Sequence, residues 1–192
     1  MDSPHIRKYI PSDKPRLQSV CMQTADDFYK KRPRLLHALP TIYNDYFTEN
    51  ESDNIFVLAD GNNNAVGYII CSSDYNKFIS KYRSVYLRRL TRSAPELIPV
   101  LLSYLICLIM IKSNPAHLHI DLLPEYQRKG WGTKLIDALR SHLNSQGIST
   151  LSVCCVSRGS PGYKMYKKYG FSEFYTHAPG MVSLCISTEK SV

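Results

Sequence analysis

The sequence predicts an α/β fold in one domain, because strand patterns and helix patterns alternate along its 192 residues. Residues 118–123 are apolar and β-prone, and an amphipathic helix pattern follows them after a turn rich in glycine. Residues 55–60 and 65–72 are further strand patterns, and the Gly-Asn-Asn-Asn turn at 61–64 favours a hairpin because these residues tolerate positive φ. An apolar content of 44% supports a folded core rather than a disordered chain.

The first part of the chain is typical of one strand followed by two helices. A strand pattern at 5–10 leads, through a Ser-Asp turn that can cap a helix, into a helix predicted to end near Tyr29. A second helical stretch covers 33–47 and is interrupted by Pro40. The first helix is expected to bury four side chains, those of Leu17, Val20, Cys21 and Phe28.

Residues 74–115 separate the predicted hairpin from the strand at 118–123. Their first part, 77–92, is basic and aromatic, and their second part, 97–111, is an apolar helix pattern. A membrane span needs about 20 apolar residues, so this shorter run predicts a buried helix instead. The basic stretch either forms a solvated helix face or binds an acidic partner, and the sequence leaves both open.

The end of the chain is typical of a strand at 149–156, a helix at 163–169, a strand that begins at Phe171 and a final strand at 181–186. Cys154 and Cys155 are adjacent in the first of these strands, so their side chains are expected on opposite faces of the sheet. The six cysteines show no CxxC spacing, which predicts reduced core thiols rather than disulfides or zinc ligands. The sequence therefore predicts no metal site.

Cysteine usage and charge also indicate the compartment and the ligands. Reduced thiols and a polar N-terminus without a secretory signal predict a cytoplasmic or nuclear protein. The formal net charge of +8 favours acidic ligands. Nucleic acid stays an alternative that rests only on this charge and on the mixture of Tyr, Lys and Arg residues. Oligomeric state is not indicated.

The turn after the strand at 118–123 has the chemistry of an anion cradle. The first turn of a helix presents unpaired backbone N–H groups and the positive end of a dipole. Gly130 and Gly132 let a ligand approach the backbone without meeting a Cβ, and Arg128 and Lys129 add positive charge. The turn matches neither the GxxxxGK[ST] of a P-loop nor the GxGxxG of a dinucleotide fold. A pyrophosphate suits this chemistry.

The stretch Pro-Glu-Tyr-Gln-Arg-Lys-Gly-Trp-Gly at 124–132 resembles the coenzyme A loop of the GCN5-related N-acetyltransferase (GNAT) superfamily. The Val-Gly-Tyr at 66–68 and the YxxxGF ending at 166–171 are similar to other parts of that family. The resemblance implies one GNAT domain over residues 1–192, with an inserted helical segment at about 74–115. The implied fold is a mixed, mostly antiparallel twisted sheet of six or seven strands with helices on both faces.

The resemblance also implies acetyl-CoA as cosubstrate and gives roles to the matching residues. Backbone groups of Leu122 and Leu123 would pair with the pantetheine arm, and Tyr166 would be the general acid near the sulfur. The pyrophosphate would lie on Gln127, Arg128, Lys129, Gly130, Trp131, Gly132 and Thr133. The family's helix before this tyrosine often starts with Asn, which is absent from the Arg-Gly-Ser-Pro-Gly stretch at 158–162.

The catalytic base has two candidates, His119 and Asp121, which alternate with His117 along one strand and so share a face. Histidine has the more suitable intrinsic pKa, whereas aspartate needs burial to raise its pKa. The same His-x-His-x-Asp spacing permits a metal site, although three ligands on a regular strand rarely converge on one ion. Three aromatic residues are candidates for lining the acceptor pocket, with core packing as the alternative: Tyr43, Tyr46 and Phe47.

The implied activity is direct transfer of the acetyl group from acetyl-CoA to a primary amine, which would be a small amine, an amino sugar, a polyamine or a protein lysine. The alternative is a catalytically inactive GNAT-like module that binds acetyl-CoA or, through 77–92, a partner. The segment 74–115 and the glycine loop also resemble the acetyltransferase-like region attached to some O-GlcNAcases, a group in which loss of activity has been suspected.

Overall fold

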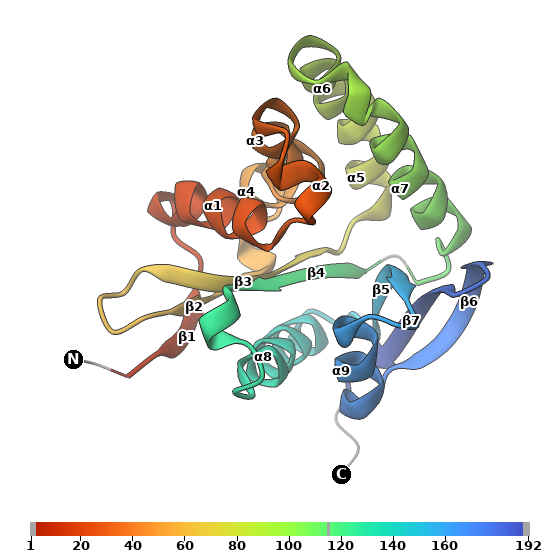
Figure 1. The fold of residues 1–192 in the computed structure, drawn as a ribbon. Coiled ribbons are helices and arrows are strands. Elements are labelled where there is room, and N and C mark those ends of the chain that lie inside the picture. The colour runs from red at the N-terminus through yellow and green to blue at the C-terminus, as the bar shows by residue number, and fades with distance from the viewer. Residues whose placement is uncertain (1–2, 115, 190–192) are drawn as a thin grey trace.

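The computed structural model describes residues 3–114 and 116–189, which form one α/β domain (Figure 1). The two ends of the predicted domain, 1–2 and 190–192, lie outside the described residues. Pro115, at the end of the predicted insertion, lies outside them as well. All of the candidate site residues fall within the described part.

Seven strands form one mixed sheet in the order β1-β2-β3-β4-β5-β7-β6. Every neighbouring pair is antiparallel except β4 and β5, which run parallel. This arrangement confirms the predicted mixed, mostly antiparallel sheet. The strands are β1 His5–Lys8, β2 Ile55–Ala59, β3 Ala65–Ser72, β4 His117–Leu122, β5 Thr150–Ser157, β6 Ser172–Ala178 and β7 Met181–Ser187.

Helices cover both faces of the sheet (Figure 1). One face carries α1 Lys14–Thr24, α2 Asp27–Lys30, α3 Pro33–Tyr43, α4 Asp45–Asn50, α5 Tyr75–Lys81, the π-helical η3 Tyr82–Tyr86, α6 Leu87–Ser93 and α7 Ile98–Met110. The other face carries α8 Trp131–Ser145 and α9 Pro161–Tyr169. Short 3-10 turns are η1 Pro11–Asp13, η2 Ser52–Asn54, η4 Pro95–Leu97 and η5 Pro124–Tyr126. In the part of the chain that the structure describes, no helix is both long and apolar enough to cross a bilayer.

The first helix is shorter than predicted. It ends at Thr24, and Ala25 is extended before α2 begins. The carboxylate of Asp26 accepts a hydrogen bond from the backbone N–H of Phe28 and so starts a new helix in another direction. Phe28, which was expected to be buried, is therefore 51% exposed, and the guanidinium of Arg32 lies over its ring.

An aromatic cluster anchors the helices of the first face to each other. Tyr46 and Phe47, at the start of α4, are fully buried, and the ring centroid of Tyr46 lies 4.6 Å from that of Phe78. Phe78 stacks in turn on Tyr82 of η3, with centroids 4.3 Å apart. Tyr46 and Phe47 are core residues, and the expectation that they line an acceptor pocket is wrong for both, because the helices at 75–93 cover them.

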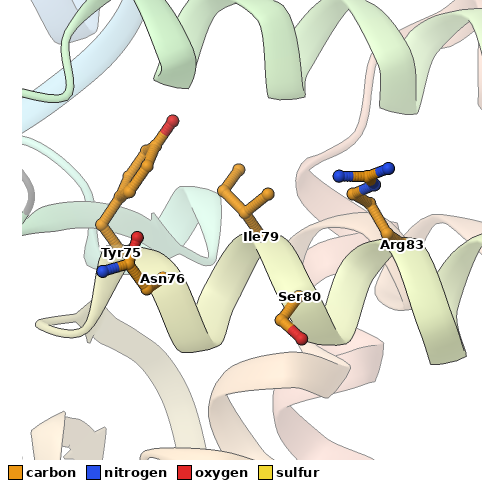
Figure 2. Close-up of a pocket in the computed structure, with 5 residues that line it drawn as sticks. All are labelled: Tyr75, Asn76, Ile79, Ser80 and Arg83. Carbon is orange, nitrogen blue, oxygen red and sulfur yellow. The ribbon is translucent and has the colours of Figure 1, made fainter.

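The basic segment 77–92 divides into a buried aromatic side and an exposed cationic side. Arg89 turns toward the domain, where its guanidinium donates two hydrogen bonds of 2.8 and 2.9 Å to the carboxylate of Glu49. Five other cationic side chains stay exposed, those of Lys77, Lys81, Arg83, Arg88 and Arg92. A shallow hollow of about 410 Å³ lies beside them, lined by Tyr75, Asn76, Ile79, Ser80 and Arg83 (Figure 2). This hollow contains none of the predicted site residues.

The sheet opens between its two parallel strands. β4 and β5 are paired only at His117 with Ser152 and at Leu118 with Val153. β4 continues beside β3 as far as Leu122, whereas β5 leaves it. The backbone of β5 bulges between Val153 and Val156, where its register against β7 shifts. The outer half of β4 therefore borders an opening that the rest of the sheet does not fill.

The same bulge overturns the expectation for the two adjacent cysteines. Cys155 has a φ of +53°, which is outside the extended range of a strand. The side chains at 154 and 155 consequently do not alternate across the sheet, and both thiols lie near the thiol of Cys107 in α7, that of Cys155 within 4.8 Å of it.

Candidate functional site

The loop between β4 and α8 has the geometry of an anion cradle. After η5, the backbone turns through positive φ at Arg128 (+58°) and Gly130 (+81°). Gly130 is the N-cap of α8, and its carbonyl accepts the first helical hydrogen bond, from Lys134. The N–H groups at 131–133 consequently project from the free end of the helix, where its dipole is positive. Thr133 is exposed, as are the side chains of Arg128 and Lys129.

The two glycines of the loop serve different purposes. A Cβ built at Gly130 meets nothing within 4 Å, so this glycine supplies the left-handed turn and leaves its surroundings open. A Cβ at Gly132 would lie 2.9 Å from the sulfur of Met165 in α9. Gly132 thus lets the side chain of Met165 pack closely against α8, which differs from the expectation that both glycines make room for a ligand.

The backbone of β4 offers hydrogen bonds to the opening at even-numbered positions. The N–H of Leu123 donates to the carbonyl of Val66 in β3, and the carbonyl of Leu123 accepts from Tyr126. Both backbone groups of Leu123 are therefore already bonded, which argues against the predicted pairing of Leu123 with a pantetheine arm. Alternation along the strand turns the backbone of Leu122 and Ile120 toward the opening instead.

Two other loop residues make contacts within the protein. The side-chain amide of Gln127 donates a 2.8 Å hydrogen bond to the carbonyl of Leu122 and so holds the loop to the end of β4. The ammonium of Lys134 lies 4.3 Å from the centroid of the Trp131 ring. These contacts order the rim of the cradle, on which the cationic side chains at 128, 129 and 134 gather.

On the opposite face of the sheet, β4 presents a hydrogen-bonded pair. Nε2 of His119 lies 3.0 Å from Oδ2 of Asp121, and the hydroxyl of Tyr68 donates a 2.6 Å bond to the same oxygen. The ring of Tyr43 stacks on His119 with centroids 5.5 Å apart. The side chains of His119 and Asp121 keep 32% and 19% exposure, so a ligand in the opening reaches them.

The electrostatics of this pair distinguish the two candidate bases. Burial lowers the pKa of His119, but the neighbouring carboxylate of Asp121 outweighs burial and leaves that pKa above its ordinary value. Burial raises the pKa of Asp121, yet the charge of His119 and the hydrogen bonds from His119 and Tyr68 bring it below its ordinary value. Asp121 thus stays ionised and holds the imidazole, which argues against it as the base.

Tyr166 lies on α9, on the cofactor side of the sheet. It is 6% exposed, and its ring packs against Phe171 with centroids 5.2 Å apart. Burial, assisted by the charge of Asp121, raises the pKa of the phenol well above its ordinary value, so the hydroxyl keeps its proton. The family asparagine before this helix is replaced by a serine cap, since Ser160 accepts a 3.0 Å bond from the N–H of Tyr163.

His117 belongs to the core rather than to the site. It is 1% exposed, and its ring packs edge-on against Phe78 with centroids 4.6 Å apart. The His-x-His-x-Asp spacing therefore does not assemble a metal site in the described part of the chain, because His119 and Asp121 bond to each other while His117 packs into the aromatic cluster.

The places of Tyr43 and Tyr68 in the site were predicted only in part from the sequence. The Val-Gly-Tyr segment was identified as a strand motif, but nothing in its spacing indicates that Tyr68 bonds to Asp121. Tyr43 was a candidate for the acceptor side, and the structure brings it onto His119. The antiparallel register of β3 and β4 places Tyr68 opposite Asp121. This register is the signal that connects Tyr68 with Asp121.

A mixed sheet that opens between two parallel strands, with a glycine-led helix start at that opening, defines an α/β domain that binds a phosphate-bearing cofactor at a split in its sheet. Residues 18–171 match the model of the acetyltransferase (GNAT) family. The chain therefore belongs to the GNAT family of acetyltransferases, whose cosubstrate is acetyl-CoA. No curated protein matches the sequence.

Solved structures give the same fold. The crystal structure of SsHAT is 28% identical, with a TM-score of 0.85 over 98% of this chain and 100% of that one. The PaiA N-acetyltransferase from Thermoplasma acidophilum, solved with coenzyme A, is 16% identical, with a TM-score of 0.61 over 97% and 99%. A polyamine N-acetyltransferase from Drosophila melanogaster is 13% identical, with a TM-score of 0.55 over 96% and 100%. The resemblance to the O-GlcNAcase-attached branch stays a prediction.

Proposed function

We propose that this protein transfers the acetyl group of acetyl-CoA directly to a primary amine, with the cofactor and the acceptor reaching the sheet from opposite faces. The separation of β4 from β5 beyond Leu118 and Val153 carries the proposal. On one side of this opening lie the helix start at Gly130 and the phenol of Tyr166. On the other side lies the pair of His119 and Asp121.

The cradle holds the pyrophosphate of the cofactor. The free N–H groups at the start of α8 and the side chains of Arg128 and Lys129 suit a polyanion, as helix N-termini do in general. The edge of β4 that faces the opening, at Ile120 and at the N–H of Leu122, suits the amides of a pantetheine arm because extended groups add to a strand edge by backbone hydrogen bonds. The carbonyl of Leu122 already accepts a hydrogen bond from the side chain of Gln127, which the arm would have to replace or share. Acetyl-CoA bound in this way supplies the acetyl group, as a thioester, at the opening.

His119 takes the proton of the attacking amine, and Asp121 positions His119. As the amine nitrogen forms its bond to the acetyl carbon, the neutral imidazole removes one proton from that nitrogen. The bond between carbon and sulfur then breaks, and Tyr166 gives a proton to the departing thiolate. The phenol with its raised pKa stays protonated until the thiolate forms, which suits a donor.

The acceptor enters beside α3 and α7. Tyr43 stacks on His119, and its ring lies 5.8 Å from that of Tyr104 in α7. Apolar ring faces beside a titratable pair suit an amine that carries a hydrocarbon part. Small amines, amino sugars, polyamines and protein lysines all meet this description. The PaiA and polyamine N-acetyltransferases share the fold at low identity, so they support an amine acceptor in general and not a particular one.

The test has a binding stage and a turnover stage. Calorimetric titration with acetyl-CoA, and with CoA for comparison, is expected to show one site per chain. A panel of amines is then assayed for release of the CoA thiol, and at least one class is expected to accelerate it. Absence of acetyl-CoA binding would contradict the cradle, and binding without turnover by any amine class would favour the inactive module.

A further inference from the structure

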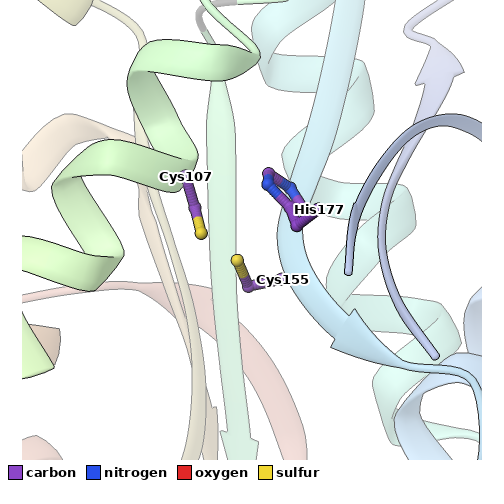
Figure 3. Close-up of side chains that lie close together, drawn as sticks. All are labelled: Cys107, Cys155 and His177. Carbon is purple, nitrogen blue, oxygen red and sulfur yellow. The ribbon is translucent and has the colours of Figure 1, made fainter. Parts of the chain in front are cut away.

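A cluster of soft ligands lies away from the pair of His119 and Asp121, on the same side of the opening as α7. Cys107 of α7, Cys155 of β5 and His177 of β6 bring one ligand atom each within 4.8 Å of one another (Figure 3). Figure 3 shows the two sulfur atoms facing each other, with the imidazole ring of His177 beside them. These residues are widely separated in sequence, so only the fold assembles them.

Cys154 lies beside this group without being one of the three residues whose ligand atoms lie within 4.8 Å of one another. Its thiol influences the pKa values of both Cys107 and Cys155, so it is near enough to serve as a fourth ligand if its side chain turns toward the group. The bulge at Cys155, with its φ of +53°, is what turns two adjacent cysteines toward the same helix. All three cysteines and His177 are partly buried, which leaves an ion a path to them.

A serine beneath the cluster orients two of these residues. The hydroxyl of Ser183 in β7 lies 2.7 Å from Nε2 of His177 and accepts a 3.4 Å bond from the backbone N–H of Cys155. Histidine ligands of metal sites characteristically have such a partner on the ring, because it fixes the tautomer and the ring direction.

We propose that Cys107, Cys154, Cys155 and His177 bind one zinc ion. Two sulfur atoms and one imidazole nitrogen already lie together, and no carboxylate belongs to the group. The sulfur of Cys154 would complete the Cys₃His ligand set of structural zinc sites. Ligand atoms of a tetrahedral site with Zn–S bonds of about 2.3 Å lie about 3.8 Å apart. The ligand atoms of Cys107, Cys155 and His177, which lie within 4.8 Å of one another, therefore have to move closer together to bind an ion, and the side chain of Cys154 has to turn toward them.

Zinc at this position joins α7 to the strands beyond the opening. Cys107 lies in the helical segment 74–115, whereas the other three ligands belong to β5 and β6. Tyr104, which lies in the same helix as Cys107, packs against Tyr43 at the acceptor side of the opening, with ring centroids 5.8 Å apart. The ion consequently fixes the helix that borders the acceptor against the strand that leaves β4.

The neighbouring thiol of Cys154, together with burial, raises the pKa of the Cys155 thiol. Burial, with a smaller effect from Cys155, raises the pKa of the Cys107 thiol to about 12. The thiols are therefore protonated without metal, and zinc has to displace their protons. Binding is expected to release protons and to strengthen as the pH rises.

The experiment uses the full chain, reduced and treated with a chelator. Zinc is titrated in competition with a chromophoric chelator, and one equivalent is expected to bind. Cobalt added in its place is expected to give thiolate-to-metal charge-transfer absorption together with the visible bands of a tetrahedral ion. Neither readout depends on acetyl-CoA or on turnover, so the result is independent of the proposed activity.

His177→Gln and Cys107→Ser are each expected to weaken zinc binding by about tenfold or more, since even indirect partners of a ligand are worth that much. Cys185→Ser, which removes a β7 thiol outside the cluster, is the control and is expected to bind as the native chain does. His177→Gln leaves every thiol in place, so it decides the question if Cys107→Ser does not fold.

Three results would overturn the proposal: no zinc bound by the reduced chain, cobalt without charge-transfer bands, or equal affinity in His177→Gln and the native chain. A disulfide between Cys107 and Cys155 that forms in air and that zinc does not prevent would also overturn it, because the cluster would then be a redox pair.

Discussion

The cofactor loop at 124–133 and the acceptor face around His119 differ in how the chain builds them. The loop is one continuous stretch, and its form follows from positive φ at Arg128 and Gly130 and from the start of α8. The acceptor face takes Tyr43 from α3, Tyr68 from β3 and His119 from β4. Backbone conformation within one stretch makes most of the first, whereas side chains from three separate elements make the second.

This difference has consequences for mutation. A loop built from backbone groups tolerates most side-chain changes except those that alter φ or place charge in the cradle. An acceptor face built from hydrogen bonds and ring stacking depends on each side chain that takes part. The two regions are therefore expected to respond to different substitutions. Variants of each region, compared with matched controls, measure the two responses separately.

The largest expected effect is that of His119→Gln. Glutamine keeps a hydrogen bond to Asp121 but cannot take the proton of the amine, so kcat is expected to fall by about 10²–10⁴-fold. Affinity for acetyl-CoA is expected to be unchanged, because His119 faces the other side of the sheet. Steady-state kinetics and calorimetry measure the two quantities. His142→Gln, on α8, is the control, and a similar loss of kcat there would remove His119 as the base.

Gly130→Glu tests the cofactor side. Glutamate strains a backbone with φ of +81° and places a negative charge where the pyrophosphate is expected, so affinity for acetyl-CoA should fall by about 100-fold, a loss of about 3 kcal/mol. Gly147→Glu is the matched control, because Gly147 has a φ of +76°, is equally open, and lies at the other end of the same helix. Equal affinity in Gly130→Glu and the native chain would contradict the cradle.

The cofactor loop was predictable because its information is local. Gly130, the Pro-Glu-Tyr lead-in and the apolar stripe of α8 all lie within one short stretch, and each has a direct backbone meaning. The seven strands followed similarly from local patterns and from the family resemblance. The early end of α1 was missed because Asp26 restarts a helix at a point where the hydrophobic spacing continues.

The acceptor side and the cysteine cluster were not predictable in this way. Tyr43 reaches His119 only because α3 crosses the face of β4, and spacing along the chain does not encode that crossing. The adjacent cysteines were placed on opposite faces because a regular strand was assumed. The positive φ at Cys155 breaks that rule, and no residue type preferred for positive φ marks the position.

Tyr166→Phe tests the difference between the two regions further, because Tyr166 lies on the cofactor side of the sheet but is proposed to donate a proton in the reaction. Loss of the hydroxyl is expected to lower kcat by about 10–100-fold, at the low end of general acid catalysis, with acetyl-CoA affinity unchanged. Tyr169→Phe on the same helix removes a phenol that bonds Asp137 at 2.8 Å. That control should lower stability by about 1 kcal/mol and leave kcat unaltered. Equal kcat in Tyr166→Phe and the native protein would exclude it as the acid.

The smallest effect is expected from Asp121→Asn, and it appears in the pH dependence. The carboxylate raises the pKa of His119, so the native rate should fall as the pH drops through a value above the ordinary 6.5. Asparagine removes that charge while burial still lowers the pKa of His119, so the acid limb of the profile should move to lower pH. The rate at its plateau should fall about tenfold as the ring loses its orientation. An acid limb at the native position would mean that the titrating group is not His119.

Asp121→Asn is also expected to change how the stability of the fold depends on pH. A raised His119 pKa stabilises the fold below its ordinary 6.5, and a lowered Asp121 pKa stabilises it above its ordinary 3.8. The native pair therefore contributes most between these two pH values, and its contribution declines as the pH rises through the pKa of folded His119. Thermal unfolding of Asp121→Asn should show the largest loss of Tm within this window and a smaller one at higher pH. A loss of Tm that does not depend on pH would mean that Asp121 stabilises the acceptor face by packing rather than by its ion pair with His119.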